Sequence, residues 1–144
     1  MKFVDLNNSN RTGSSYKKVI KKIVDDGVCP FCPDQLANYH KNPILEENDY
    51  WIATENMYPY EGAKHHIIFI SKKHLTEISE LDPSAWQNLQ EIVNSISKRL
   101  KIKGGTLFMR FGDTKFTGAS VNHLHAHLIS PHQKNQTPIM ARVG

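Results

Sequence analysis

The stretch Ser120-Val-Asn-His-Leu-His-Ala-His-Leu-Ile129 places three histidines at a spacing of two, with apolar residues between and after them. Side chains alternate between the two faces of a β-strand, so a strand here puts the three imidazoles on one face and the intervening apolar side chains on the other. The apolar face can pack into a core while the imidazoles line a cleft. The spacing therefore predicts a strand over 120–129 that carries a functional group of histidines.

The residues alone leave three roles open for these histidines. Packing gives no reason to align three imidazoles, so a purely structural role is disfavoured. Three imidazoles could hold one catalytic zinc ion, since imidazole is a common zinc ligand. Alternatively, one neutral imidazole could attack phosphorus as a nucleophile while an acceptor holds its other ring N–H, and a second nucleophile would resolve the phosphoramidate.

A loop of small residues, Thr117-Gly-Ala-Ser120, leads into the histidine strand. Glycine and alanine let the backbone approach an anion closely, and the backbone N–H groups and the serine hydroxyl can donate to phosphate oxygens. A glycine-containing loop is usually only a turn, but its position directly before the histidines favours phosphate binding. The candidate residues are Gly118, Ala119 and Ser120.

Both cysteines of the chain lie in one C-x-x-C motif, at Cys29 and Cys32. A disulfide framework is disfavoured in the cytosol, and a thioredoxin-like redox pair lacks its expected strand-to-helix context. Half of a zinc site is the favoured interpretation, with two further ligands from elsewhere. Spacing does not choose among the candidates, which are His40, His65, His66, His74 and the three histidines of 120–129.

The rest of the chain predicts an α+β domain. A short helix is expected from about Tyr16 to Asp25, and a long amphipathic helix begins at Pro83 and ends at Gly104-Gly105, with a stripe that includes Trp86. The expected strands are 44–47, 50–55, 65–71, 106–111 and 120–129. They predict an antiparallel meander of about five strands with the long helix over one face. Residues 1–13 are expected to form a flexible tail, 14–131 the domain, and 132–144 an extended tail.

Composition limits the class of protein. The 144 residues suffice for one domain, and 39% hydrophobic with 22% charged residues is typical of an ordinary soluble globular protein. No apolar run approaches the roughly 18–20 residues of a membrane span, and no secretory signal is visible, so a cytoplasmic location is expected. The net charge is 18 − 14 = +4 with the lysines spread out, which disfavours a long nucleic acid as partner but suits a small anionic substrate.

The run His123-Leu-His-Ala-His-Leu-Ile129 resembles the signature of the histidine triad family. Upstream, Asn56-Met-Tyr-Pro-Tyr60 and His66-Ile-Ile-Phe-Ile-Ser-Lys-Lys-His74 resemble the family's loop and histidine strand. The resemblance covers about residues 28–131. It implies the HIT-like fold, a homodimer whose strands join into one continuous sheet, and action on nucleoside phosphates as a hydrolase, transferase or phosphorylase.

The resemblance also implies residue roles. His125 would be the nucleophile that attacks the α-phosphorus, and His127 would face the phosphate. The other positions that it places around the substrate are Asn56, His66, Arg110, Gly118, Ala119 and Ser120. Arg110 stands where the family usually has the asparagine of an N-x-G motif, and a guanidinium there could hold a phosphate bidentately.

Zinc-bearing relatives with a C-x-x-C motif use two histidines as the remaining ligands. Carried over, this implies a structural tetrahedral zinc site of Cys29, Cys32, His74 and His123. His123 would then be withdrawn from chemistry.

The expected function is cleavage of a phosphoanhydride or phosphoramidate at the α-phosphorus through a nucleotidyl-histidine, by a hydrolase or nucleotidyltransferase. The loop at Asn56 resembles that of members acting on diadenosine tetraphosphate, which favours dinucleoside polyphosphates. Two alternatives are a nucleotide-binding module with vestigial catalysis and a zinc hydrolase that uses all three triad histidines as ligands.

Overall fold

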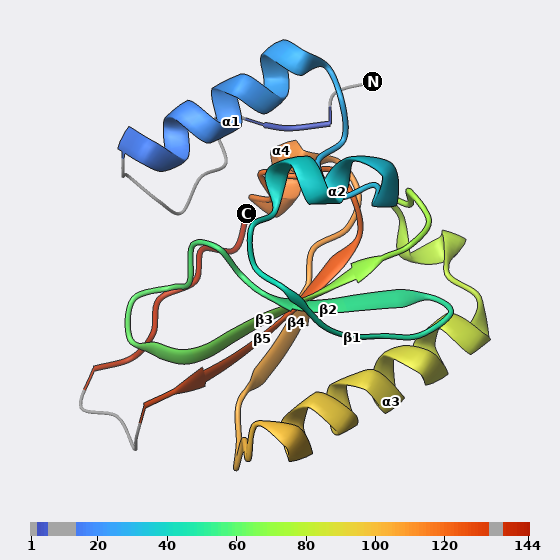
Figure 1. Cartoon of the computed structure of the whole chain (residues 1–144), viewed down its shortest axis with the longest axis vertical. Coiled ribbons are helices and arrows are strands. Elements are labelled where there is room, and N and C mark those ends of the chain that lie inside the picture. Colours follow the sequence, from blue (N-terminus) through green and yellow to red (C-terminus); the bar gives the residue numbers. More distant parts are fainter. Residues whose placement is uncertain (1–2, 6–13, 133–136) are drawn as a thin grey trace.

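The computed structural model describes residues 3–5, 14–132 and 137–144. A five-stranded antiparallel sheet separates the long helix α3 (Pro83–Arg99) from the helices α1 (Ser14–Asp26) and α2 (Pro33–Tyr39), as Figure 1 shows. The strands are β1 (Ile44–Glu47), β2 (Trp51–Glu55), β3 (Ala63–Ser71), β4 (Thr106–Met109) and β5 (His125–Pro131). A 3₁₀ turn η1 (Ile78–Glu80) and a short helix α4 (Thr114–Thr117) lie in the connections. The predicted α+β class is confirmed.

The strand order is β1-β2-β3-β5-β4, so the predicted meander is wrong. Strand β5 is inserted between β3 and β4 instead of following β4 at the edge. Six of its seven residues are buried, while β4 has two exposed residues among its four. A strand that is buried on both faces is stabilised in the middle of a sheet, and a half-exposed strand tolerates the edge.

The register of β3 and β5 divides the sheet into a structural face and a histidine face. On one face, Ile67 pairs with Leu128 and Phe69 with Ala126, and these residues form the main core with α3. On the other face, the positions opposite Ile68 and Ile70 in β3 are His127 and His125. Helix α2 packs on this second face through the buried Leu36. The alternation predicted from the sequence therefore holds for these two histidines.

The predicted strand over 120–129 begins only at His125. The preceding segment leaves the ladder because other segments take its backbone groups: the Leu124 N–H donates to the Leu75 carbonyl, and the Asn122 N–H donates to the Phe3 carbonyl. His123 consequently lies in a bend outside the strand, so the expectation that all three histidines share one strand face is wrong.

The helices differ from the prediction in detail. Helix α1 begins two residues before the predicted Tyr16 and ends at Asp26, and the following Gly27 has φ +66°. Helix α3 starts at Pro83 as predicted but ends at Arg99, before the two glycines, because Lys101 adopts a left-handed φ of 56°. Trp86 is 42% exposed, since its neighbour Ala85 and not Trp86 faces the sheet. Helix α2 was not predicted at all.

The two ends of the described chain contact the domain. Within residues 1–13 the structure describes 3–5, where Val4 is buried and bridges to Val121; the rest of the predicted flexible tail lies outside the described residues. At the other end, the Arg110 guanidinium donates to the Arg142 carbonyl. No helix in the described part of the chain has the length and apolar character that a membrane span requires.

Candidate active site and metal centre

Four side chains from three separate segments form a candidate metal centre. Cys29 and Cys32 flank the turn before α2, His74 follows β3, and His123 lies in the bend before β5. Their ligand atoms all lie within 4.8 Å of one another. The bend that removes His123 from the strand is what turns its ring toward the cysteines.

The spacing of these atoms fits a tetrahedral ion. The two histidine Nδ1 atoms are 3.2 Å apart, and Cys29 Sγ and Cys32 Sγ each lie 3.4 Å from one of them. Tetrahedral zinc bonds of about 2.0–2.1 Å to nitrogen and 2.3 Å to sulfur place such atoms about 3.3 Å and 3.6 Å apart. The group is therefore suited to hold a tetrahedral metal ion.

The surroundings of the group are also suited to a cation. Burial, with the neighbouring Cys29 and Asp34, raises the pKa of the Cys32 thiol to about 12, a cost that a bound cation would remove by stabilising the thiolate. The Nε2 of His123 lies 2.6 Å from the Ser71 carbonyl oxygen, so this nitrogen carries the hydrogen and Nδ1 keeps a lone pair for the ion.

His125 is held in one tautomer by the backbone. Its Nδ1 lies 2.7 Å from the His123 carbonyl oxygen, and because a carbonyl only accepts, Nδ1 carries the hydrogen. The lone pair is then on Nε2. Burial lowers the pKa of the ring to about 4, partly opposed by this hydrogen bond and reinforced by the Arg110 charge, so the imidazole is neutral near pH 7. A buried neutral imidazole with an orienting acceptor has the form of a nucleophile.

A chain of hydrogen bonds orients His127. The Tyr60 backbone N–H donates to His66 Nδ1 at 3.1 Å, so a neutral His66 carries its hydrogen on Nε2. His66 Nε2 lies 2.9 Å from His127 Nδ1 and donates to it, which leaves the hydrogen of His127 on its Nε2. The amide nitrogen of Asn56 is also 3.3 Å from His66 Nε2, but two N–H groups cannot bond each other, so the shorter contact determines the tautomer.

Aromatic rings fix the planes of both imidazoles. The Phe108 ring stacks on His127 with centroids 4.6 Å apart and an interplanar angle of 9°. The Phe31 ring meets His125 edge-on at 4.9 Å. Neither phenylalanine was predicted from the sequence to lie at the site. Pairing of β4 with β5 puts Phe108 directly beside His127, and only the topology reveals that contact.

A cavity opens over the histidine face. Four of the predicted site residues line it, namely Asn56, Ser120, His125 and His127. The other predicted residues lie around it: His66 is buried and lies 2.9 Å from His127, and Gly118 and Ala119 directly precede Ser120 in the loop. The Ala119 N–H donates to Thr117 Oγ1, so it is engaged within the loop.

Arg110 lies over the ring of Phe108. Its guanidinium carbon is 4.9 Å from the ring centroid, and Phe108 in turn stacks on His127. Arg110 and Phe108 also line a second cavity of about 740 Å³ between β4 and residues 138–143. Arg110 therefore places a positive charge at this second cavity, next to the ring that stacks on His127.

The three triad histidines do not surround one point. His123 faces the cysteines, His125 is bound to a backbone carbonyl and His127 to His66. Among the described residues, the cysteine–histidine group is the one cluster of three or more ligands spaced for a metal. This geometry does not provide the three-histidine metal site that was considered as an alternative.

The comparisons with known proteins agree with this architecture. A family model described as "Scavenger mRNA decapping enzyme C-term binding" matches residues 29–141. The chain belongs to this family of histidine triad proteins. The predicted resemblance is confirmed, and the match begins at the first cysteine of the metal group. No curated protein matches the chain.

Several solved histidine triad structures are similar. A HIT family hydrolase from Clostridium thermocellum is 25% identical, with 85% of this chain and 96% of that chain covered and a TM-score of 0.53. A hypothetical histidine triad nucleotide-binding protein from Sulfolobus tokodaii is 25% identical, with 76% and 72% covered and a TM-score of 0.58. A zinc-bound histidine triad protein from Mycobacterium smegmatis shares the fold at 17% identity, with 76% and 78% covered and a TM-score of 0.55.

Proposed function

We propose that this histidine triad protein is a nucleotide hydrolase or nucleotidyltransferase that cleaves its substrate at the α-phosphorus through a nucleotidyl-histidine. The observation that carries the proposal is the 2.7 Å hydrogen bond from His125 Nδ1 to the His123 carbonyl, which leaves the lone pair of Nε2 at the cavity. A buried ring that is neutral at pH 7 can attack without first losing a proton.

In the first step, His125 Nε2 forms a bond to the α-phosphorus as the bond to the leaving group breaks. The electron pair departs with the leaving group, and the Nδ1–H stays hydrogen-bonded to the His123 carbonyl, which stabilises the positive charge on the ring. In the second step, water attacks the same phosphorus, the nitrogen–phosphorus bond returns its electrons to Nε2, and one proton passes to solvent. Inorganic phosphate in place of water would give the phosphorylase reaction.

The tautomer of His127 favours a particular leaving group. His127 presents an N–H on Nε2, but giving up that hydrogen entirely would leave an imidazolate, because His66 is itself neutral. His127 therefore stabilises a leaving oxygen by donating a hydrogen bond and does not transfer a proton. A leaving group that is already stable as an anion, such as the polyphosphate of a dinucleoside polyphosphate, suits this arrangement better than an amine.

The remaining predicted residues have roles in the proposal. Ser120 at the cavity, with Gly118 and Ala119 beside it, would contact phosphate oxygens, Asn56 would contact the ribose, and Arg110 the distal phosphates. The cysteine–histidine group would hold zinc in a structural role, because its two sulfur and two nitrogen donors suit that ion. Zinc there would fix the turn before α2 to the bend before β5.

A homodimer is part of the proposal. Strand β4 is an edge strand with two exposed residues, and its Leu107 is 49% exposed. An unpaired, partly apolar edge can join the same edge of a second copy into one continuous sheet. The cytoplasmic location also stays a prediction.

The mechanism is tested by rapid quenching with a substrate labelled at the α-phosphorus, beginning with diadenosine tetraphosphate. We expect label on the wild-type protein and none on His125→Ala, with turnover lowered at least about a thousandfold. The matched control is His132→Ala, which removes an exposed histidine outside the cavity. Full turnover by His125→Ala would overturn the covalent mechanism, and tight nucleotide binding without turnover in wild type would favour a binding module.

A further inference from the structure

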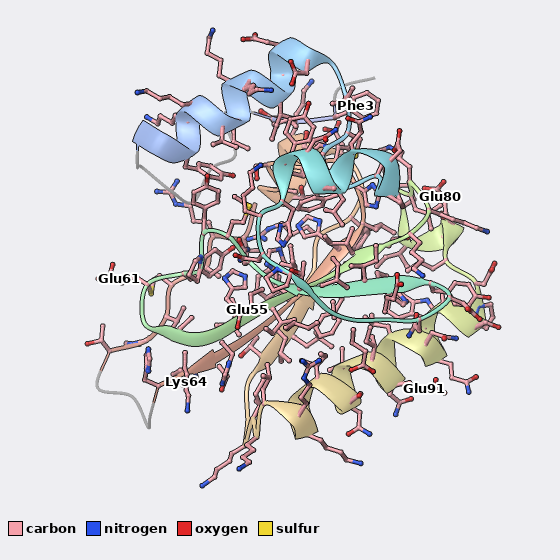
Figure 2. The ribbon with its side chains drawn as sticks, in the orientation of Figure 1. Phe3, Glu55, Glu61, Lys64, Glu80 and Glu91 are labelled. Carbon is pink, nitrogen blue, oxygen red and sulfur yellow. The ribbon has the colours of Figure 1, made fainter. Side chains whose placement is uncertain are left out.

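Helix α1 forms one wall of the cavity that contains the catalytic histidines. The helix lies on the histidine side of the sheet, opposite α3, and in Figure 2 the labelled Phe3 lies on this side while Glu91 lies on α3. The buried stripe of α1, namely Tyr16, Ile20 and Ile23, lines the cavity together with the half-buried Val19. This helix precedes the segment matched by the family model, which begins at residue 29.

The cavity has the chemistry of a subsite for a flat aromatic group. Three aromatic side chains, Phe31, Tyr39 and Tyr58, also line the cavity, and the last two pack against the buried residues of α1. The aliphatic side chains of α1 line it as well, together with His125 and His127. Apolar and aromatic walls with a few polar groups are typical of sites for ring systems such as a nucleobase.

The cavity is too small for a nucleotide as it stands. Its volume is about 90 Å³, whereas sites for organic ligands of this size measure about 300–1,000 Å³. The sheet and the metal group hold the other walls in place. Helix α1 takes no part in the sheet, so it is the wall that can move without breaking a strand pairing.

Contacts from the helix itself and from the segment before it hold α1 against the domain, and the Tyr39 hydroxyl donates to Asp26 at 2.6 Å. The Tyr16 hydroxyl lies 3.0 Å from Ser120 Oγ, and the Tyr16 ring meets Tyr58 edge-on at 4.8 Å. The Asp5 N–H donates to the Ser120 carbonyl at 2.8 Å. The contact of Tyr16 is thus made to the very hydroxyl that is proposed to bind phosphate.

We propose that α1 is a movable wall of the nucleobase subsite, which opens to admit the nucleotide and then packs its apolar stripe on the base. Tyr16 acts as a positioning residue that holds the Ser120 hydroxyl toward the phosphate. This inference rests on the proposed function, because it assigns the base of that same substrate to the cavity under α1.

The experiment measures the affinity of the full chain for adenosine monophosphate and for ribose 5-phosphate, which lacks the base. We expect Ile20→Ala to weaken binding of the monophosphate about tenfold and to leave ribose 5-phosphate unchanged, since Ile20 would touch only the base. Lys18→Ala, on the exposed face of the same helix, is the matched control and should change neither. Should Ile20→Ala fail to fold, Val19→Ala from the same wall replaces it.

Hydrogen exchange supplies a second measurement. Backbone amides of α1 should exchange more slowly when adenosine monophosphate is bound, because the closed helix then packs on the base. Tyr16→Phe should weaken binding of both ligands equally, since it acts at the phosphate end.

The outcomes separate this inference from the proposed function. Tighter binding of the monophosphate by Ile20→Ala, with faster hydrogen exchange in α1 on binding, would show that α1 blocks the cavity. That result would overturn the proposal that α1 packs on the base. Unchanged affinity would also overturn it, while the nucleotide site itself would stand. If wild type binds neither ligand and forms no labelled His125, the proposed function fails first.

Discussion

The Nδ1 atom of His125 lies 2.7 Å from the carbonyl oxygen of His123, whose own ring lies among the candidate metal ligands. One residue therefore belongs to two sites: its side chain joins the cysteines, and its backbone orients the proposed nucleophile. The Ser71 carbonyl holds the far side of the same ring. An ion bound to the His123 ring would thus help to fix the His123 carbonyl, and through it the tautomer of His125.

Loss of the metal ligands is expected to affect stability and catalysis together. The double substitution Cys29→Ser and Cys32→Ser should abolish zinc binding and lower the melting temperature, because a structural ion stabilises the folded chain. It should also lower kcat about tenfold or more, since the carbonyl acceptor of His125 is then held less firmly. Metal analysis, thermal unfolding and steady-state kinetics measure the three effects.

His125→Ala is the control for this prediction, because it removes the nucleophile and leaves all four ligands in place. It should retain one zinc per chain. Full zinc content in the cysteine double variant would contradict the assignment and would mean that other residues bind the ion.

The hydrogen bond from His66 to His127 gives a second prediction. His66→Leu removes the donor and leaves His127 Nδ1 as a buried acceptor without its partner. We expect kcat to fall about 10²-fold with little change in KM, since the N–H of His127 acts as the leaving group departs.

The conservative variant separates positioning from packing. His66→Gln keeps an N–H near the place of Nε2, so it should recover a large part of the lost kcat, whereas a merely structural role predicts similar losses for both variants. Nuclear magnetic resonance of the His127 ring nitrogens would show whether the tautomer has changed.

Much of the site could be predicted because its signals are local in the sequence. The alternation of His125 and His127 with apolar residues specifies two faces of a strand, and the structure has those faces. The cysteine pair required partners from elsewhere, and here the residues alone left several histidines open. The family resemblance pointed to His74 and His123, which the fold does bring to the cysteines.

The errors come from contacts between distant segments. Nothing near His123 in sequence indicates that Phe3 and Leu75 take the backbone groups beside it and bend the chain out of the strand. The place of β5 inside the sheet depends on burial of both its faces, which a search for alternation underestimates. Trp86 fits a helical stripe by size and spacing, but the buried arc of α3 is centred on Ala85 and Ile92.

Acid should destabilise the protein partly through His40. Burial lowers the pKa of this ring, whose Nε2 lies 2.7 Å from Thr54 Oγ1. In the unfolded chain the ring takes up a proton as the pH falls below about 6.5, while the folded ring stays neutral to lower pH. The contribution of His40 is therefore complete above pH 6.5 and is lost as the pH falls.

His40→Gln tests this contribution. Glutamine can keep a hydrogen bond to Thr54 but does not titrate, so the free energy of unfolding should fall less between pH 7 and pH 5 than in wild type. Urea unfolding at the two pH values measures the difference. An identical decrease in both proteins would show that other groups account for the whole acid effect.

The guanidinium of Arg110 should determine which leaving groups are accepted. It lies over the Phe108 ring, which stacks on His127, and it lines the second cavity, where we propose that the distal phosphates bind. Arg110→Ala should lower kcat/KM for diadenosine tetraphosphate about 10- to 100-fold, the loss expected for one charged hydrogen bond. For a nucleoside phosphoramidate with a neutral amine leaving group, the loss should be threefold or less.

The kcat/KM of Arg110→Lys for diadenosine tetraphosphate should lie between those of wild type and Arg110→Ala, since lysine keeps the charge but lacks the planar fork. Equal losses on both substrates would show that Arg110 acts by holding residues 137–144 through the Arg142 carbonyl, and not by binding the departing phosphates.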